Sequence, residues 1–301
     1  MQNKLCLVTG ATDGIGKAAA RALLQAGASV ILHGRDPVKT GRVVAELCEH
    51  GDLDSVIADF ASLDAVGKMA VEVRQRFGKL DVLINNAGLL TDHRQSGQDG
   101  FELTFAVNYL APYLLTRLLL NGSGINTSGR IVNVASSAMG GGTICFDDLH
   151  GEKSFNGWQA YANSKLANVL FSNVLAGYLA DEFADLGAVS NALCPGLIDT
   201  NFFHTNTVFA NGAYERMQPG MRTPAEGAAI PVYLAMAPEA RTINGKFFMR
   251  QPGYFSATEF RPLDIDWDRA IAQRLWEVSH AYVSPWLETG IEPSSVSPSS
   301  A

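Results

Sequence analysis

The segment TGATDGIGKAA, residues 9–19, follows a short apolar run at residues 4–9 and opens a helix-like pattern that extends to residue 26. Its glycines, Gly10, Gly14 and Gly16, remove the Cβ atoms that would keep an anion off the backbone, and a helix N-terminus presents N–H groups with partial positive charge. A strand, a glycine loop and a helix in this order predict a pyrophosphate-binding loop. Because the spacing differs from the general G-x-G-x-x-G pattern, a glycine turn that only packs the helix on the strand is the alternative.

Short β-rich runs alternate with longer helix-like segments along the chain. Strands are predicted at residues 4–9, 29–33, 55–58, 81–84, 130–135, 188–193 and 246–249, and the longest helices at about 97–120, 158–182 and 224–236. The strands are apolar throughout, which is typical of a parallel sheet with helices on both faces. The sequence therefore predicts an α/β Rossmann fold in a single domain, residues 1–284, with a doubly wound parallel sheet of about seven strands.

Three segments interrupt this alternation. Residues 139–157 form a long insertion between a strand and a helix, and residues 197–222 form a second long connection that is predicted to be a substrate lid. Both follow strand carboxyl ends, the edge at which open α/β sheets bind ligands. Residues 285–301 are rich in proline and serine and are predicted to be a disordered tail.

The composition favours a small-molecule partner. The 301 residues contain 23 Lys and Arg against 30 Asp and Glu, a formal net charge of −7, which disfavours binding to nucleic acid or to an anionic membrane surface. The four cysteines are far apart, as in proteins of a reducing compartment. The first residues lack a secretory signal pattern, and the apolar window at residues 109–120 is too short for a membrane span. We therefore expect a cytoplasmic protein without a membrane span, for which a homo-oligomer is possible.

The residues after the second strand bear on the choice of cofactor. An acidic side chain there would hold a ribose 2′-hydroxyl, whereas an arginine would receive a 2′-phosphate. Asp36 precedes Pro37 and is well placed to cap a helix that begins with proline, which leaves Arg35 free to face the adenosine. The sequence thus favours NADP (NADPH) over NAD, and a solvated surface charge is the alternative role for Arg35.

Tyr161 and Lys165, in the segment YANSK, are four residues apart and therefore lie on one helix face. An ordinary tyrosine titrates near roughly 10, and a neighbouring ammonium favours the phenolate. The pair is a candidate general acid/base. A chance pair on a helix surface is the alternative, but the preceding strand ends in Ser136 and Ser137, whose hydroxyls would lie at the same sheet edge.

Metal chemistry is not predicted. Asp147, Asp148 and His150 lie close together in the insertion, but metal sites need several convergent ligands and the other histidines are scattered. Loop capping and surface charge are the simpler interpretation of this group.

Six ordered motifs resemble those of the short-chain dehydrogenase/reductase superfamily, over essentially the whole chain up to about residue 283. They are TGATDGIG, NNAG at residues 85–88, Asn108, IVNVASS at residues 131–137, YANSK and Pro195-Gly196. FELTFAVNYLAPYLLT, YANSKLANVLF and RLWEVS are similar to the branch that contains retinol dehydrogenases and WW-domain oxidoreductases. The resemblance implies an enzyme that moves a hydride between nicotinamide and a carbonyl or alcohol carbon.

The resemblance also implies roles for four catalytic residues. Tyr161 would exchange the proton, and Lys165 would lower its pKa while bonding the nicotinamide ribose. Ser137 would bond the substrate oxygen, with Ser136 as the alternative serine. Asn108 would position a water molecule that links Lys165 to solvent, or it could simply bond backbone groups at a bend before Pro112.

The implied cofactor contacts extend along the same sheet edge. Asp59 resembles a residue that contacts adenine, although it could instead cap the helix that starts near Ser62. The full implied set comprises Gly10, Asp13, Gly14, Ile15, Gly16, Arg35, Asp59, Phe60, Asn86, Ala87, Gly88, Tyr161, Lys165, Pro195, Gly196 and Thr200.

The variable walls of the pocket are predicted to be apolar, which favours a small lipophilic aldehyde, ketone or alcohol as the substrate. Packing of the lid onto the body is the alternative role for any one of these side chains. A non-catalytic dinucleotide sensor or scaffold is the alternative function. The predicted walls are Leu89, Leu90, Met139, Phe146, Phe155, Trp158, Phe202, Phe203, Val208 and Phe209.

Overall fold

The computed structural model describes residues 4–210, 212–250 and 261–288. In these residues one sheet has the strand order β3-β2-β1-β4-β5-β6-β7-β8. Strands β1 to β7 are parallel, and β8 pairs with β7 in the antiparallel direction. The strands are Leu5–Val8 (β1), Ser29–Gly34 (β2), Leu53–Ile57 (β3), Leu80–Asn85 (β4), Ile125–Val134 (β5), Val189–Cys194 (β6), Phe247–Met249 (β7) and Arg261–Leu263 (β8).

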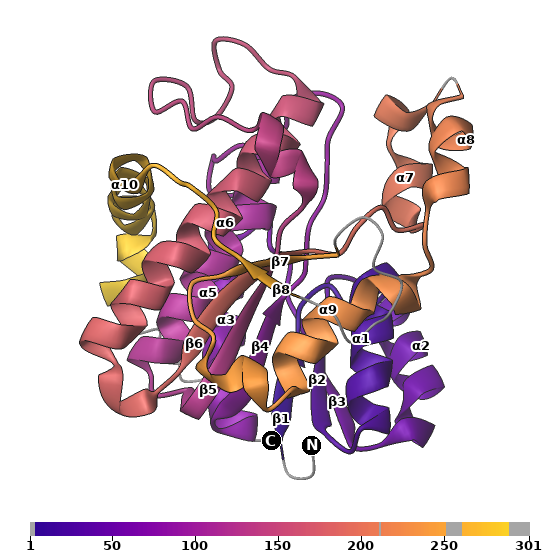
Figure 1. The fold of residues 1–301 in the computed structure, drawn as a ribbon, viewed down its shortest axis with the longest axis vertical. Coiled ribbons are helices and arrows are strands. Elements are labelled where there is room, and N and C mark those ends of the chain that lie inside the picture. The colour runs from indigo at the N-terminus through magenta and orange to yellow at the C-terminus, as the bar shows by residue number, and fades with distance from the viewer. Residues whose placement is uncertain (1–3, 211, 251–260, 289–301) are drawn as a thin grey trace, which may run out of the picture.

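Helices cover both faces of this sheet (Figure 1). The main helices are Gly14–Gln25 (α1), Pro37–Leu47 (α2), Leu63–Phe77 (α3), Leu103–Phe105 (α4), Ala111–Asn121 (α5), Gly157–Glu182 (α6), Pro224–Met236 (α9) and Arg269–Glu288 (α10). Alternate side chains of β1 belong to different core layers: Leu7 packs in the layer of α3, α5 and α6, whereas Cys6 and Val8 pack in the layer of α1, α2 and α9. The predicted doubly wound Rossmann fold is therefore confirmed.

The strand order reverses between β1 and β4, which places the first βα loop and the loop after β4 at one crevice. The edge strand β8 was not predicted. It has only three residues, and its Pro262 lacks an N–H for a sheet ladder, so the sequence does not read as a strand. Proline is tolerated at a sheet edge, where one side of the strand needs no partner.

The helix predicted at about 97–120 begins later and is irregular. Both carboxylate oxygens of Glu102 accept backbone N–H groups, from Thr104 and Phe105, and so start the helix at Leu103. A π-helical turn, η2 (Ala106–Leu110), then leads into α5. Pro112 has no N–H to donate to the carbonyl four residues earlier, at Asn108, and so favours such a local widening.

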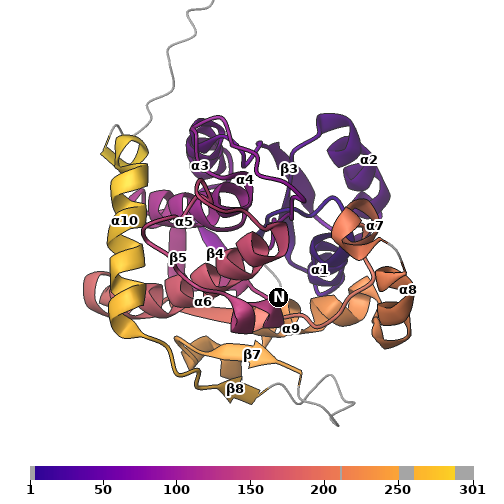
Figure 2. The ribbon, with the colours of Figure 1, turned by 90° about the horizontal axis from the view of Figure 1, so that it is seen from above.

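Helix α10 runs beside α5 and α6 (Figure 2). It was not predicted, and it continues through Pro285 to Glu288, so the first residues of the predicted tail are helical. Residues 289–301 lie outside the described residues. The Tyr109 hydroxyl bonds the Ser279 hydroxyl at 2.7 Å, and the Tyr113 hydroxyl donates to the Trp276 carbonyl at 3.3 Å. These buried contacts fix α10 to the central helices.

Among the described residues, the helical stretch 103–121 is long and apolar enough to meet the criteria for a membrane span. However, 94% of its most apolar window is buried inside the fold. Such burial is typical of a core helix that packs on all sides. The length and apolar composition of this stretch are therefore only weak evidence for a membrane span.

The two long connections rise from the carboxyl end of the sheet (Figure 1). The segment 197–222 is closed at its base by a parallel bridge between Ile198 and Arg222, and it contains the short helices α7 (Asn201–Thr205) and α8 (Ala213–Met217). We call residues 197–222 the lid. The insertion begins with a 3₁₀ turn, η3 (Ser137–Gly141). The other 3₁₀ turns are Cys48–His50 (η1), Ala184–Leu186 (η4), Thr207–Phe209 (η5), Gln218–Gly220 (η6) and Glu239–Thr242 (η7).

Candidate active site

A cavity of about 830 Å³ opens at the carboxyl ends of the strands, between the glycine loop and the lid. It brings together predicted residues that are as far apart in the sequence as Gly10 and Thr200. Gly16 and Asn108 are predicted site residues that do not line it. The predicted site residues that line it are Gly10, Asp13, Gly14, Ile15, Arg35, Asp59, Phe60, Asn86, Ala87, Gly88, Ser137, Tyr161, Lys165, Pro195, Gly196 and Thr200.

The glycine loop has no room for side chains. Gly10 has a φ of +62°, and a Cβ there would lie 2.7 Å from the Cα of Ala87. A Cβ on Gly16 would lie 2.4 Å from the carbonyl oxygen of Gly10 and 2.5 Å from the Asn86 amide nitrogen. The backbone is thus bare where helix α1 begins, and the first N–H groups of a helix have no intrahelical partner. These features fit a pyrophosphate group against the loop.

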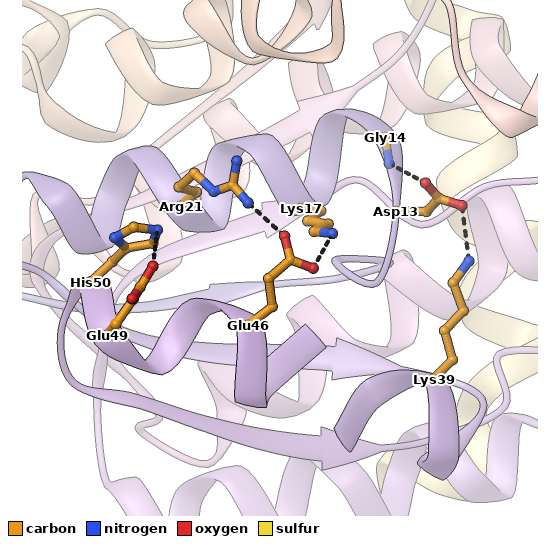
Figure 3. Close-up of polar contacts among 8 residues, drawn as sticks. All are labelled: Asp13, Gly14, Lys17, Arg21, Lys39, Glu46, Glu49 and His50. Atoms are coloured by element: carbon orange, nitrogen blue, oxygen red, sulfur yellow. Dashed lines mark hydrogen bonds and ion pairs between the residues drawn. The ribbon is translucent and has the colours of Figure 1, made fainter. Parts of the chain in front are cut away.

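Asp13 caps helix α1, since its Oδ1 accepts the Gly14 N–H at 2.8 Å. Its Oδ2 accepts from the Lys39 ammonium at 2.9 Å (Figure 3) and from the side-chain amide of Asn201 in the lid. Partial burial alone would raise the pKa of the Asp13 carboxyl, but hydrogen bonds from Lys39, Asn201 and Gly14 outweigh burial and lower it. Asp13 is therefore an anion that joins the loop, α2 and the lid.

His33 supports the opposite side of the loop, and the sequence analysis did not include it in the site. Its Nδ1 accepts the Gly10 N–H at 3.2 Å, so the neutral ring carries its proton on Nε2 and donates to the Ala58 carbonyl at 3.0 Å. The ring stacks on Phe60 at 4.3 Å and lines the cavity. A histidine inside the apolar run SVILHG was the available signal.

The two residues after β2 have different surroundings in the structure. Asp36 caps α2 by accepting the Lys39 N–H at 2.9 Å, with Pro37 at the first helical position, so the capping interpretation is confirmed. Arg35 is exposed and lines the cavity together with Lys39, which the sequence analysis missed. Two cations therefore stand beside the adenosine end that was predicted for a 2′-phosphate.

Asp59 lines the cavity at this end. Its carboxylate accepts the Ala61 N–H at 3.0 Å in a tight turn. The proposed alternative, that Asp59 caps α3, is wrong, because Ser62 is the cap and accepts the Ala65 N–H at 3.3 Å. Asp59 is thus left at the cavity wall.

Tyr161 and Lys165 project from α6 into the cavity, with the ammonium 5.5 Å from the centre of the phenol ring. Lys165 is only 4% exposed and donates to the Val134 carbonyl at 3.0 Å. The Ser136 side chain lies close enough to the Tyr161 hydroxyl to lower the pKa of that phenol. Ser137 also lines the cavity, and its N–H donates to the Cys194 sulfur at 3.1 Å. Ser136 and Ser137 thus both line the cavity, and which of them would bond the substrate oxygen stays a prediction.

Burial dominates the electrostatics of this pair. It raises the pKa of the Tyr161 phenol, and the Ser136 side chain offsets only part of the effect. It lowers the pKa of Lys165 from 10.5 to about 8. The predicted lowering of the Tyr161 pKa is therefore not found in the free protein. Removal from water favours the neutral form of each group, which is the protonated phenol of Tyr161 and the deprotonated amine of Lys165.

Asn108 is fixed by the backbone contacts that were its alternative role. Its side-chain carbonyl accepts the Leu89 N–H at 2.8 Å, and its amide donates to the Leu89 carbonyl at 2.9 Å and to the Ser164 hydroxyl at 2.9 Å. Asn108 still lies near the ammonium, because a Cβ built on Gly88 would be 3.4 Å from both the Asn108 oxygen and the Lys165 nitrogen.

Aromatic rings of the lid close over the reacting end of the cavity. The Tyr161 ring lies 5.1 Å from Phe202 and 5.7 Å from Trp158. Phe209 packs against Phe202 and Phe203 at 5.7 and 4.7 Å. Of the predicted walls, Leu89, Leu90, Trp158, Phe202, Phe203 and Phe209 line the cavity, whereas Met139, Phe146, Phe155 and Val208 do not.

Two of the excluded wall residues have visible structural roles. Phe146 packs under the Arg274 guanidinium of α10 at 4.1 Å, and Met139 packs against the core beside β6 and β7. In the described part of the chain, no group of three or more metal-ligating side chains gathers. Asp148 instead accepts the N–H groups of Glu152 and Lys153, which confirms loop capping for that residue.

Comparison with known proteins identifies relatives over most of the chain. The family model for short chain dehydrogenases matches residues 4–209. The chain is 36% identical to retinol dehydrogenase 14 of Mus musculus, over 94% of this chain and 86% of that protein. It is 31% identical to polyprenol dehydrogenase of Homo sapiens, over 92% of this chain and 84% of that protein.

A solved structure supports the same assignment. A short chain dehydrogenase from Burkholderia cenocepacia J2315, in complex with NADP, superposes with a TM-score of 0.66 at 27% identity, over 82% of this chain and 95% of that one. The family match, the identity to the relatives and the arrangement of the sheet lead to one conclusion. The chain belongs to the short-chain dehydrogenase/reductase family, in its retinol dehydrogenase-like branch.

Proposed function

We propose that this oxidoreductase uses NADP to interconvert a lipophilic carbonyl compound and its alcohol, with Tyr161 as the general acid/base. One observation carries the proposal: the Tyr161 hydroxyl, the glycine loop and the aromatic rings of the lid share one cavity. A nicotinamide dinucleotide held there would supply or accept the hydride. The bare loop at Gly10 and Gly16 fits its pyrophosphate, and Arg35 and Lys39 fit a 2′-phosphate.

Tyr161, the neighbouring serines and Lys165 would supply the proton and polarise the substrate oxygen. A phenol with a raised pKa holds its proton at neutral pH and is suited to donate it to a carbonyl oxygen. Ser136 or Ser137 would hydrogen-bond the same oxygen. Lys165, cationic below about pH 8, would stabilise the phenolate that remains. The neutral phenol is the form that donates a proton in carbonyl reduction, and the phenolate is the form that accepts one in alcohol oxidation.

The preference for NADP rests on Arg35 and Lys39. A 2′-phosphate would bring additional negative charge to an end of the cavity lined by Arg35 and by Lys39, which also pairs with Asp13. Charge-assisted hydrogen bonds are roughly twice as strong as neutral ones. Arg35→Ala should therefore weaken NADPH binding about tenfold and NADH binding little, as measured by the fluorescence of the bound cofactor. Equal losses for the two cofactors would contradict this assignment.

The aromatic wall of the cavity beside Tyr161 supports a lipophilic substrate. Rings that approach Tyr161 on two sides favour an apolar substituent next to the reacting carbon, and fully burying an apolar side chain contributes about 1.5–3 kcal/mol. The names of two relatives, retinol dehydrogenase and polyprenol dehydrogenase, also refer to lipophilic alcohols.

The activity test is a panel of hydrophobic aldehydes and ketones with NADPH, followed at the absorbance of the reduced nicotinamide. Tyr161→Phe should bind NADPH normally and reduce the same compounds at least a hundredfold more slowly, the usual contribution of a general acid. Unchanged turnover in this variant would refute the mechanism. No turnover by the wild-type protein on a broad panel would favour the sensor or scaffold role.

A cytoplasmic location and a homo-oligomer stay predictions. Cell fractionation tests the first, and sedimentation equilibrium of the purified chain tests the second. Recovery of the chain with the membrane fraction would contradict the first.

A further inference from the structure

The lid begins directly against the glycine loop. A Cβ built on Gly14 would lie 2.9 Å from the Cγ2 of Thr200, the residue before α7. The next residue, Asn201, donates its side-chain amide to Asp13 Oδ2. Two consecutive lid residues, Thr200 and Asn201, therefore lie against Gly14 and Asp13, where α1 begins. Motion of either segment must disturb the other.

The single carboxylate of Asp13 accepts hydrogen bonds from three parts of the fold, which are α1, α2 and the lid. Its Oδ1 holds the start of α1, and its Oδ2 accepts from Lys39 of α2 and from Asn201 of the lid. Figure 3 shows Lys39 reaching across to Asp13. Helices α1 and α2 are themselves joined by Glu46, which pairs with Lys17 and Arg21. The lid is thus attached to a braced pair of helices.

The far side of the lid has a comparable attachment. The Asp92 carboxylate, in the loop after β4, accepts the N–H groups of Thr207 and Val208 at 3.2 Å each. Between the two attachments lie Phe202 and Phe203, which line the cavity. Phe202 lies 5.1 Å from the Tyr161 ring, so the position of the lid sets the shape of the reacting end.

We propose that Asp13 is a positioning residue that fixes the lid to the glycine loop through Asn201 and thereby sets the affinity for substrate. Asp13 acts on the substrate through Phe202 and touches no reacting atom. This role goes beyond the proposed function, but its effect on substrate rests on that function.

The test is a charge exchange between the two partners. Asn201→Asp places a second carboxylate against Asp13 and should repel the lid, whereas Asn201→Ala removes the hydrogen bond to Asp13 without adding a charge. Asp13→Asn combined with Asn201→Asp restores an amide–carboxylate pair in the reverse direction and keeps a good helix cap, because asparagine and aspartate cap equally well. Asp64→Asn is the control, an aspartate in the first turn of α3 that pairs with Lys68 at 2.7 Å and has no contact with the lid in the described structure.

The primary measurement is trypsin cleavage after Arg216, an exposed lid residue, without cofactor or substrate. We expect about three- to tenfold faster cleavage in Asn201→Ala, more in Asn201→Asp, and a rate within about twofold of wild type in the exchanged variant and in Asp64→Asn. Cleavage of Asn201→Asp at the wild-type rate, or no recovery on exchange, would overturn the proposal.

The second measurement separates positioning from general damage. In the reductase assay at saturating NADPH, Asn201→Asp should raise KM for the carbonyl substrate several-fold more than it lowers kcat. A loss confined to kcat would overturn the proposal. Because proteolysis needs no turnover, an inactive wild type with the expected cleavage pattern refutes the proposed function and leaves the lid attachment standing.

Discussion

A fall in pH from 6.5 to about 4 should destabilise this protein through His33. The side chain is 3% exposed, and burial lowers its pKa from 6.5 to about 4 against a smaller opposing effect of the Ala58 hydrogen bond and Asp59. Between these two pH values the unfolded chain binds the proton and the folded chain does not. Stability is therefore fully present above pH 6.5 and is lost as the pH falls towards 4. Since each pKa unit corresponds to about 1.4 kcal/mol, the loss approaches about 3 kcal/mol.

The contribution of His33 can be isolated with a side chain that does not titrate. His33→Gln offers a hydrogen-bond acceptor and a donor to Gly10 and Ala58 without a pKa in this range. Urea unfolding at pH 7 and at pH 4.5 gives the free energy of unfolding for both proteins. Other groups titrate alike in both, so the wild type should lose about 2–3 kcal/mol more than the variant.

The refuting result is equal loss in the two proteins. It would mean that the His33 ring is hydrated or that its proton is held in the folded state, contrary to its closed environment. If His33→Gln does not fold, His33→Asn supplies the same comparison. A parallel fall in NADPH affinity of the wild type below pH 5 is expected, because an imidazolium cannot accept the Gly10 N–H.

Two further predictions address the loop and the catalytic pair. Gly16→Ala should weaken NADPH binding at least about tenfold in a fluorescence titration, because its Cβ would lie 2.4 Å from the Gly10 carbonyl oxygen. Gly41→Ala in α2 is the control: its Cβ would meet nothing within 4 Å, so it should stabilise the fold by up to about 1 kcal/mol in urea unfolding. Normal NADPH affinity of Gly16→Ala would contradict the close packing. For Lys165, kcat/KM for carbonyl reduction should fall as the pH rises through about 8, because the ammonium loses its charge there, and the fall should move to higher pH in Lys165→Arg. A flat profile from pH 7 to 9 in the wild type would argue against a catalytic cation.

The sequence was sufficient to predict those features that depend on a few neighbouring residues and have a direct physical cause. The cap at Asp36 before Pro37, the four-residue spacing of Tyr161 and Lys165, and the glycines at the start of α1 are short-range signals. Topology then brings these signals together, because parallel strands end at one edge. The fold and most of the cavity wall follow from those two facts.

What the sequence could not supply depends on partners far along the chain. Helix α10 is only weakly apolar and contains Pro285, and its position rests on contacts such as Tyr109 with Ser279, 170 residues apart. The Asp13–Asn201 contact spans 188 residues and joins two ordinary polar side chains. Likewise, adjacent serines at a strand end cannot be told apart until the turn after β5 assigns Ser136 as its cap and places it near the Tyr161 hydroxyl.

Several side chains make structural hydrogen bonds and also lie beside the candidate site. Asn108 bonds the backbone of Leu89 and nevertheless lies beside Lys165 across Gly88. Asp13 caps a helix and still holds the lid. A site that must keep polar atoms in place inside an apolar fold has to satisfy their hydrogen bonds, so the same contacts that stabilise the fold also preorganise the chemistry. Loss of activity on removing such a side chain therefore does not identify its role. Only a second readout, such as cofactor affinity, proteolysis of the lid or a pH profile, separates the two contributions.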